Sequence, residues 1–243
     1  MKIDVALTPQ LINRAQNLAG QIVVVLDILR ATSTIVTALG NQARKVIPMV
    51  EPDQVFEMKK KFPSGQTITG GERGGFKIEG FDLGNSPAEY SAEKVAGKDV
   101  ILCTTNGTKA INLVLGAREI LIGSFLNAGT VIKRLQAATP DILIVCSGRD
   151  ENPSLEDLAG AGMIIQALDS ASPGRRLTDT AKIARYVYEQ ARVTGLEEFV
   201  GQTEHGQYLR EIGMGVDILR CTTLNKFLIL PRFENGEIRA FLP

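Results

Sequence analysis

The hydrophobic positions of this chain fall into short continuous runs, separated by stretches in which apolar residues recur at helical spacing. Continuous apolar runs are typical of strands that are buried on both faces of a parallel sheet. We predict such strands at 22–26, 46–50, 100–103, 120–122 and 142–146, with a further strand at 66–69.

The amphipathic stretches predict helices near 110–115, 128–135, 158–168 and across 179–213. Asn127 is a candidate cap for the second of these, and Ser154 with Asp157 resembles a capping box in which Asp replaces the usual Glu. This alternation of strand and helix predicts an α/β protein with three layers, α/β/α, in which helices cover both faces of a largely parallel sheet.

The end of the chain has a different pattern. Two apolar segments, 227–233 and 238–242, flank the turn sequence Glu234-Asn-Gly236, which predicts a β-hairpin and therefore a mixed sheet. This hairpin could pair across a homodimer. We expect one domain over 1–243, within which a linker at 170–176 could separate a strand-rich part, 1–170, from a helical part with the hairpin, 171–243.

One short pattern occurs twice: DILRATS at 27–33 returns as DILRCTT at 217–223. Chance or a shared turn would explain the recurrence, and an old duplication is the alternative.

The composition narrows the class of protein. The chain has 243 residues, of which 44% are hydrophobic, and its 27 basic side chains balance 27 acidic ones. A chain without basic excess is not expected to wrap nucleic acid or to lie on an anionic membrane. The first ten residues do not resemble a signal peptide, and no apolar run has membrane-spanning length, so we expect a cytoplasmic protein.

Ligands of parallel α/β sheets bind beyond the carboxyl ends of the strands, and four predicted strand ends carry small, polar and charged residues in similar order. Glycine, hydroxyl and amide groups at the start of a helix favour an anion such as phosphate, although an ordinary capped turn has a similar sequence. The candidate residues at these ends are Asp27, Arg30, Thr32, Ser33, Glu72, Arg73, Thr104, Thr105, Asn106, Gly107, Thr108, Lys109, Ser147 and Arg149.

The segment 70–87 is the most unusual part of the chain, because it is rich in both glycine and charge and is long for a simple connection. Apolar residues at 76, 78, 81 and 83 favour an ordered segment over a disordered surface loop. Asn85 and Ser86 are candidate substrate-binding residues, and Ser86 followed by Pro87 predicts a capped helix start.

Acids and cations recur together near these ends. Asp27, Glu72, Glu156 and Asp157 are candidate ligands of a divalent metal, and Arg30, Arg73, Lys109 and Arg149 are candidate partners of an anionic substrate. Helix capping by Asp157 and surface ion pairs for the others are the structural alternatives.

Several familiar phosphate-binding and nucleotide-binding motifs are absent: the P-loop, the cysteine-phosphatase signature, the DxD motif and GxGxxG. Cys103 and Cys146 are interpreted as core residues. His205, the only histidine, excludes a zinc site built from several histidines, and we interpret it as a structural or surface residue, with a general acid as the alternative.

Together these motifs resemble the 2-phosphosulfolactate phosphatase family. The resemblance covers nearly the whole chain, includes His205, Gly206 and Asp217, and rests on VLDILRATST (25–34), GERGG (71–75) through GNSP (84–87), TTNGT (104–108), GSFLN (123–127) and SLED (154–157). It implies a magnesium-dependent acid phosphatase, associated with coenzyme M biosynthesis, that hydrolyses 2-phospho-3-sulfolactate to 3-sulfolactate and phosphate.

On this resemblance the expected catalytic residues are Asp27, Arg30, Glu72 and Arg73, with Mg²⁺ held by two or more of Asp27, Glu72 and Glu156 or Asp157. Either water or Asp27 could attack phosphorus. Two other functions stay open at this point: a phosphatase for another small phosphorylated hydroxy acid, and a sensor that binds a sulfonate or phosphate metabolite without catalysis.

Overall fold

The computed structural model describes residues 1–12 and 18–242. Its strands are β1 Lys2–Ala6, β2 Ile22–Leu26, β3 Lys45–Met49, β4 Thr67–Arg73, β5 Phe76–Lys77, β6 Asp99–Cys103, β7 Glu119–Gly123, β8 Ile142–Cys146, β9 Arg176–Leu177, β10 Leu230–Glu234 and β11 Glu237–Phe241. Its α-helices are α1 Ala31–Gly40, α2 Pro52–Lys59, α3 Ala92–Val95, α4 Gly107–Leu113, α5 Ala128–Gln136, α6 Leu155–Ala171, α7 Asp179–Thr194, α8 Leu196–Gln202, α9 Glu204–Glu211 and α10 Val216–Thr222.

The strands form a mixed sheet in the order β5-β4-β6-β3-β11-β10-β7-β2-β8-β1-β9. Parallel pairing joins β9, β1, β8, β2 and β7 into one group and β3, β6 and β4 into another. Between the two groups lies the antiparallel hairpin β10–β11. The predicted parallel strands with a C-terminal hairpin are thus confirmed.

The hairpin turns at Asn235 and Gly236, which have φ values of 52° and 85°. Both central residues of a type I′ turn need positive φ, which explains the Asn-Gly pair. Strand β10 pairs with β7 and β11 pairs with β3, so both outer edges of the hairpin are used inside this chain. The hairpin therefore joins the two halves of one sheet, and the expected pairing of these edges across a homodimer does not fit this arrangement.

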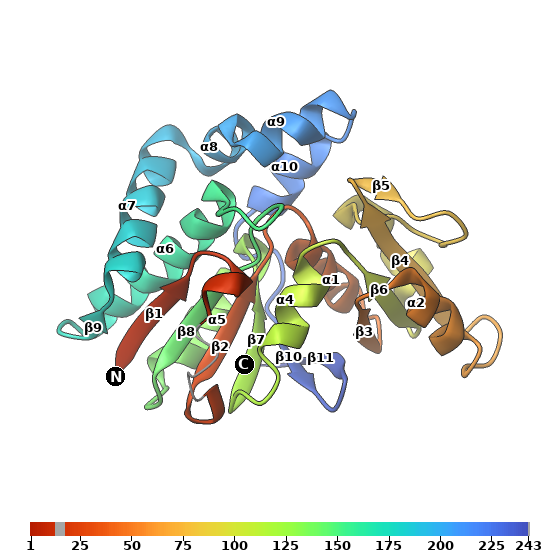
Figure 1. The fold of residues 1–243 in the computed structure, drawn as a ribbon, viewed down its shortest axis with the longest axis horizontal. Helices are drawn as coiled ribbons and strands as arrows, with labels where there is room; N and C mark the ends of the chain where they lie inside the picture. The colour runs from red at the N-terminus through yellow and green to blue at the C-terminus, as the bar shows by residue number, and fades with distance from the viewer. Residues whose placement is uncertain (13–17, 243) are drawn as a thin grey trace.

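Helices cover both faces of the sheet, and strand β2 shows how. Val23 and Val25 pack with α1 and α4, whereas Ile22, Val24 and Leu26 pack with α5, α6 and α7. Successive side chains of a strand point to opposite faces, so an unbroken apolar run serves two cores. Figure 1 shows the helices α8, α9 and α10 as a cap above the sheet. The three-layer α/β/α prediction is confirmed.

Element boundaries differ from the sequence prediction at several places. Strand β4 continues to Arg73, beyond the predicted end at 69, so that part of the segment 70–87 is sheet and turn. The predicted helical stretch 179–213 consists of three helices, α7, α8 and α9, and Gly195 at φ 93° separates the first two. Within the described residues, no helix has the length and apolar character required to span a bilayer.

The predicted caps had mixed outcomes. The Ser86 hydroxyl accepts the N–H of Ala88, and Pro87 begins a short 3₁₀ helix, as predicted. The predicted capping box at Ser154 is wrong, because the Ser154 hydroxyl makes no capping hydrogen bond. The carboxylate of Asp157 instead accepts backbone N–H groups from Ile28 and Gly148. Asp157 thus ties the loops after β2 and β8 together.

The repeated heptapeptide adopts two conformations. Residues 27–33 form the loop after β2 and the start of α1, whereas 217–223 lie mostly within α10. The two copies therefore do not share a turn. They do meet, because Arg30 of the first copy forms a buried ion pair with Asp217 of the second, at 2.8 Å.

Candidate functional site

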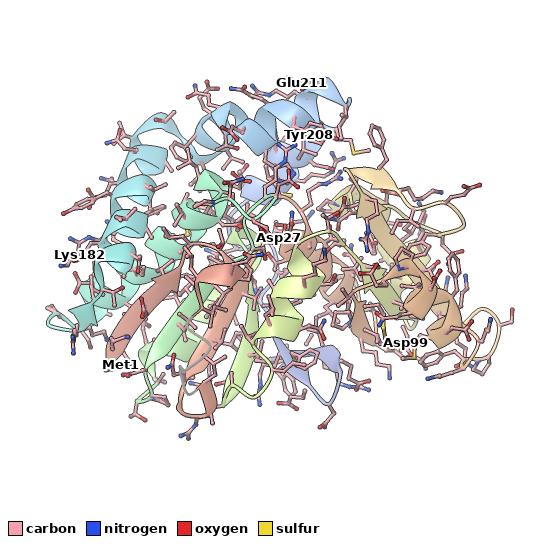
Figure 2. The ribbon with its side chains drawn as sticks, in the orientation of Figure 1. Met1, Asp27, Asp99, Lys182, Tyr208 and Glu211 are labelled. Carbon is pink, nitrogen blue, oxygen red and sulfur yellow. The ribbon has the colours of Figure 1, made fainter. Side chains whose placement is uncertain are left out.

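A cavity of about 140 Å³ lies between the cap helices and the strand ends. Figure 2 shows Asp27 near the centre of the molecule, with Tyr208 of α9 above it. The cavity is lined by Asp27, Leu29, Arg30, Glu72, Gly74, Gly75, Asn85, Thr105, Asn106, Arg149, Asp150, His205 and Tyr208. Residues that follow β2, β6 and β8 thus meet at one place with the end of β4, as the predicted strand-end arrangement requires.

Asp27 follows the last residue of β2 and is 6% exposed. Its Oδ1 accepts the N–H of Ala31 at 3.0 Å, in the first turn of α1. Gly107 at the start of α4 packs against this turn: a Cβ atom there would lie 2.5 Å from the Ala31 Cβ and 2.7 Å from Asp27 Oδ2. Glycine at this position is therefore required for the loop before α4 to approach the carboxylate.

Burial raises the pKa of Asp27 from its ordinary value of 3.8 to about 6. The hydrogen bond from Ala31 and the nearby imidazole of His205 oppose this rise, whereas the carboxylates of Glu72 and Glu156 add to it. The pKa of Asp157 is also raised well above its usual range, by burial and by the charges of Asp27 and Glu156. Burial and the proximity of other acids therefore both disfavour the charged forms of these two carboxyl groups.

Glu72 and Arg73 are neighbours in β4, and the strand directs them to opposite sides. Glu72 faces the cavity, where its Oε1 accepts the N–H of Thr105 at 2.7 Å and its Oε2 accepts the N–H of Gly75 at 2.9 Å. Arg73 faces away, and its Nη2 donates to the carbonyl of Val50 at 2.7 Å. The sequence analysis placed both residues in one site. It did not take into account that adjacent side chains of a strand point to opposite sides.

Arg30 lies in the cavity wall, and its side chain is 2% exposed. Its Nη1 donates to Asp217 Oδ2 and its Nη2 to the carbonyl of Gly75, each at 2.8 Å. Asp217 also accepts the hydroxyl of Ser86 at 2.6 Å. The Arg30 guanidinium is thus fixed in position and its charge is balanced by a buried acid.

His205 is a site residue that sequence reasoning assigned to a structural or surface role. It lies in the first turn of α9 and lines the cavity, with Nδ1 3.2 Å from Oε1 of the buried Glu156. Gly206 allows α9 to approach α8, because a Cβ there would lie 2.0 Å from the carbonyl oxygen of Val200. The signals that could have found His205 were its uniqueness in the chain and its place in the family resemblance.

Arg149 follows β8, and its guanidinium lies over the ring of Tyr208, 4.3 Å from the ring centroid. The Tyr208 hydroxyl donates to the carbonyl of Gly74 at 2.7 Å, in the turn between β4 and β5. Tyr208 was absent from the predicted site, because only the tertiary structure brings α9 over the strand ends.

The remaining candidates fall into two groups. Asn85, Thr105 and Asn106, which were predicted to bind substrate, line the cavity. Several hydroxyls instead bond to nearby backbone: Thr32 to Asp27, Ser33 to Ile28, and Thr108 to Thr104. Ser147, directly after β8, is buried, and Lys109 lies on the exposed side of α4. Most of this second group supports the loops that carry the cavity residues.

Hard oxygen donors for a metal are present in the cavity. Among residues 1–12 and 18–242, no three His, Cys, Asp or Glu side chains are close enough together to hold a metal by themselves. Magnesium commonly uses only one or two carboxylates, with water and phosphate oxygens completing its shell. Asp27 and Glu72 could supply these, and Asn85 Oδ1 is buried without a hydrogen-bond partner in the described chain. These residues fit magnesium in chemistry and charge.

Comparison with known proteins gives a consistent picture. A family model described as 2-phosphosulpholactate phosphatase matches residues 6–236. A relative from Clostridium perfringens (strain SM101 / Type A) is 43% identical over 242 residues, which cover 99% of this chain and 96% of the relative. Relatives from Carboxydothermus hydrogenoformans (42% identity, 100% and 97% coverage) and Caldanaerobacter subterraneus subsp. tengcongensis (40%, 90% and 90%) are similar. All three are named "Probable 2-phosphosulfolactate phosphatase".

Proposed function

The chain belongs to the 2-phosphosulfolactate phosphatase family, and we propose that it uses magnesium to hydrolyse 2-phospho-3-sulfolactate to 3-sulfolactate and phosphate. The observation that carries this proposal is the cavity in which two buried acids, Asp27 and Glu72, face two guanidinium groups, Arg30 and Arg149. A metabolite sensor would need the cations but has no use for buried carboxylates that line the same cavity.

Asp27 and Glu72, assisted by Asn85 Oδ1, are the residues that would hold magnesium. When bound, the ion supplies positive charge that offsets the negative charge of the phosphoryl group in the transition state. The raised pKa of Asp27 supports this assignment, because burial and two neighbouring carboxylates disfavour its negative charge, which a bound cation would stabilise. Glu156 and Asp157, also predicted as ligands, are not among the residues that line this cavity. Glu156 lies beside His205, and Asp157 accepts the backbone N–H groups of Ile28 and Gly148.

The phosphoryl group is positioned by donors from two other elements. Three N–H groups of Arg30 already donate hydrogen bonds: to the sulfur of Met214, to Asp217 and to the carbonyl of Gly75. A guanidinium carries five N–H donors, so two are left for phosphate oxygens. Asn106, before α4, adds an amide side chain that lines the same cavity. Thr105 lines it too, but its N–H and its hydroxyl both donate to Glu72.

His205 is the proposed proton donor for the leaving group. Departure of the sulfolactate alkoxide requires a proton, because aliphatic alkoxides are poor leaving groups. Glu156 lies at the Nδ1 side of the imidazole, so a proton on Nδ1 would leave Nε2 to face the substrate. The donor is the imidazole protonated on both nitrogens. Water attacks phosphorus, the bond from phosphorus to the C2 oxygen breaks, and the Nε2 proton passes to that oxygen. The protons of the attacking water stay on the phosphate product, and one of them can restore the Nε2 proton of His205.

The test is a phosphate-release assay of the purified protein on 2-phospho-3-sulfolactate, 2-phospholactate and 2-phosphoglycerate, each with magnesium and with EDTA. We expect the highest kcat/KM for the sulfonate substrate and loss of turnover in EDTA. Turnover that survives EDTA would reject the metal. A higher kcat/KM on another phospho-acid would reject the named substrate, and metabolite binding without any phosphate release would favour a sensor.

A further inference from the structure

We propose that Arg149, held against the ring of Tyr208, is the specificity-determining residue that recognises the sulfonate end of the substrate. This inference rests on the proposed function and deepens it, because it assigns one end of the substrate to one side chain.

The two arginines of the cavity differ in whether a buried acid already neutralises their positive charge. The Arg30 side chain is 2% exposed and is paired at 2.8 Å with a carboxylate that is 1% exposed. The nearest acid to Arg149 is Asp150, at 3.6 Å, and the Asp150 side chain is 75% exposed. Solvent screens a pair of that kind strongly. Arg149 Nη1 also donates to the carbonyl of Glu204 at 3.5 Å, which leaves further N–H donors of the guanidinium available to a substrate anion.

Arg149 also lies at the right end of the site. The reacting phosphate must lie beside Asp27 and Glu72, in the cavity of about 140 Å³. A neighbouring cavity of about 610 Å³ shares Arg149, Asp150 and His205 with it and is further lined by polar residues that include Asn152, Ser154 and Thr203, and by the acids Glu156 and Glu204. A substrate whose phosphate occupies the small cavity would extend its three-carbon skeleton past His205 toward Arg149.

The chemistry of the sulfonate favours an arginine. A sulfonate is an anion at every pH at which the enzyme folds, and its charge is spread over three weakly basic oxygens. A guanidinium is also charged at every such pH, and its planar array of N–H groups matches two oxygens at once. Neutral donors alone would discriminate poorly between a sulfonate and an uncharged group of the same size.

Tyr208 and the turn after β8 hold Arg149 in place. Arg149 and Asn152 exchange two backbone hydrogen bonds of 2.9 Å across a turn in which Asp150 and Glu151 have φ values of 49° and 66°. The Tyr208 ring covers the guanidinium, a contact that favours a cation at a fixed position. Because the Tyr208 hydroxyl bonds to Gly74, two residues beyond Glu72, the sulfonate end and the metal end are positioned together.

The experiment compares kcat/KM for 2-phospho-3-sulfolactate with that for 2-phospholactate, in which hydrogen replaces the sulfonate. We expect Arg149→Met to lower kcat/KM for 2-phospho-3-sulfolactate by about 100-fold. The ratio of this kcat/KM to that for 2-phospholactate should fall by at least about tenfold, as for loss of a charged hydrogen-bond pair. Arg192→Met, on the exposed side of α7, is the matched control and should keep the wild-type ratio.

Two variants separate the ring of Tyr208 from its hydroxyl. Tyr208→Phe keeps the surface on which Arg149 lies and should keep the substrate ratio. Tyr208→Leu removes the ring and should lower the ratio severalfold, in the same direction as Arg149→Met. Calorimetry with 3-sulfolactate provides a readout independent of turnover, in which Arg149→Met should weaken binding by at least about tenfold.

The outcomes are distinguishable. If the wild type releases phosphate and Arg149→Met keeps the ratio of the two kcat/KM values within twofold of the wild-type ratio, the role of Arg149 is overturned. A ratio lowered equally by Tyr208→Phe and Tyr208→Leu would overturn the role of the ring. Phosphate release from neither substrate by the wild type would overturn the proposed function, and this inference with it.

Discussion

Asp27 is a buried carboxyl group whose negative charge is reinforced by two further acids, Glu72 and Glu156. In the metal-free protein this charge is destabilising. The folded protein binds the Asp27 proton more tightly than the unfolded chain does, with a pKa of about 6 against 3.8. The tighter binding of this proton therefore stabilises the fold fully below pH 3.8, and this stabilisation is lost as the pH rises through 6.

Asp27→Asn removes this charge. In EDTA at pH 7.5 the variant should be more stable than the wild type by up to about 3 kcal/mol, the free energy that corresponds to a pKa displaced from 3.8 to about 6. Urea unfolding measures the difference, which should disappear near pH 4. The same substitution should lower kcat by at least about 1000-fold, since it alters a proposed metal ligand beside the reacting phosphate. A less stable, fully active variant would contradict both assignments.

His205 and Glu156 form the second residue pair with a testable chemical role. If His205 protonates the leaving group, its importance depends on how poor that group is. His205→Gln should lower kcat by about 100-fold for 2-phospho-3-sulfolactate and by much less for p-nitrophenyl phosphate, whose leaving phenolate needs no proton. Steady-state kinetics on the two substrates provides the measurement. Equal losses on both would remove His205 from proton transfer.

At the scale of elements, the first turns of α1 and α4 must approach each other closely for the site to form. Gly107→Ala would place a methyl group 2.5 Å from the Ala31 Cβ and 2.7 Å from Asp27 Oδ2. We expect a loss of about 1–3 kcal/mol in the free energy of unfolding, typical of overpacking, together with a fall in kcat/KM. Gly20→Ala is the control, because nothing lies within 4 Å of its new Cβ. Equal stability of the two variants would show that the contact relaxes easily.

At the scale of the whole molecule, the buried pair of Arg30 and Asp217 joins the loop after β2 to α10, 187 positions apart in the chain. Breaking such a pair leaves an uncompensated buried charge. Asp217→Asn should therefore lower the free energy of unfolding by about 3 kcal/mol. Thermal unfolding with Asp179→Asn as a control tests this, since the exposed Asp179 pairs with Lys182 at the surface and its loss should leave Tm unchanged. A similar Tm for both variants would contradict the prediction.

The candidate site could be predicted from the sequence only in part. Asp27, Glu72, Asn85, Thr105, Asn106 and Arg149 were predicted and do line the cavity. Arg73 was predicted to hold the anionic substrate, but it bonds to Val50 on the far side of the strand from Glu72, because adjacent strand residues face opposite sides. His205 and Tyr208 come from α9, and nothing in their local sequence says that this helix lies over the strand ends. Local patterns identify strand ends and turns, whereas packing between distant elements selects which side chains face the cavity.

The sequence alone determined the α/β class, the buried strands, the Asn-Gly hairpin and the family, because each depends on local periodicity, turn chemistry or ordered motifs. Only the tertiary structure decided where the hairpin pairs, between β7 and β3, and which acids remain uncompensated. It also decided that Arg30 forms a buried ion pair with Asp217, whereas the acid beside Arg149 is the exposed Asp150. The physical reason is that burial, charge balance and hydrogen-bond partners depend on residues far apart in the chain, which local patterns do not bring together.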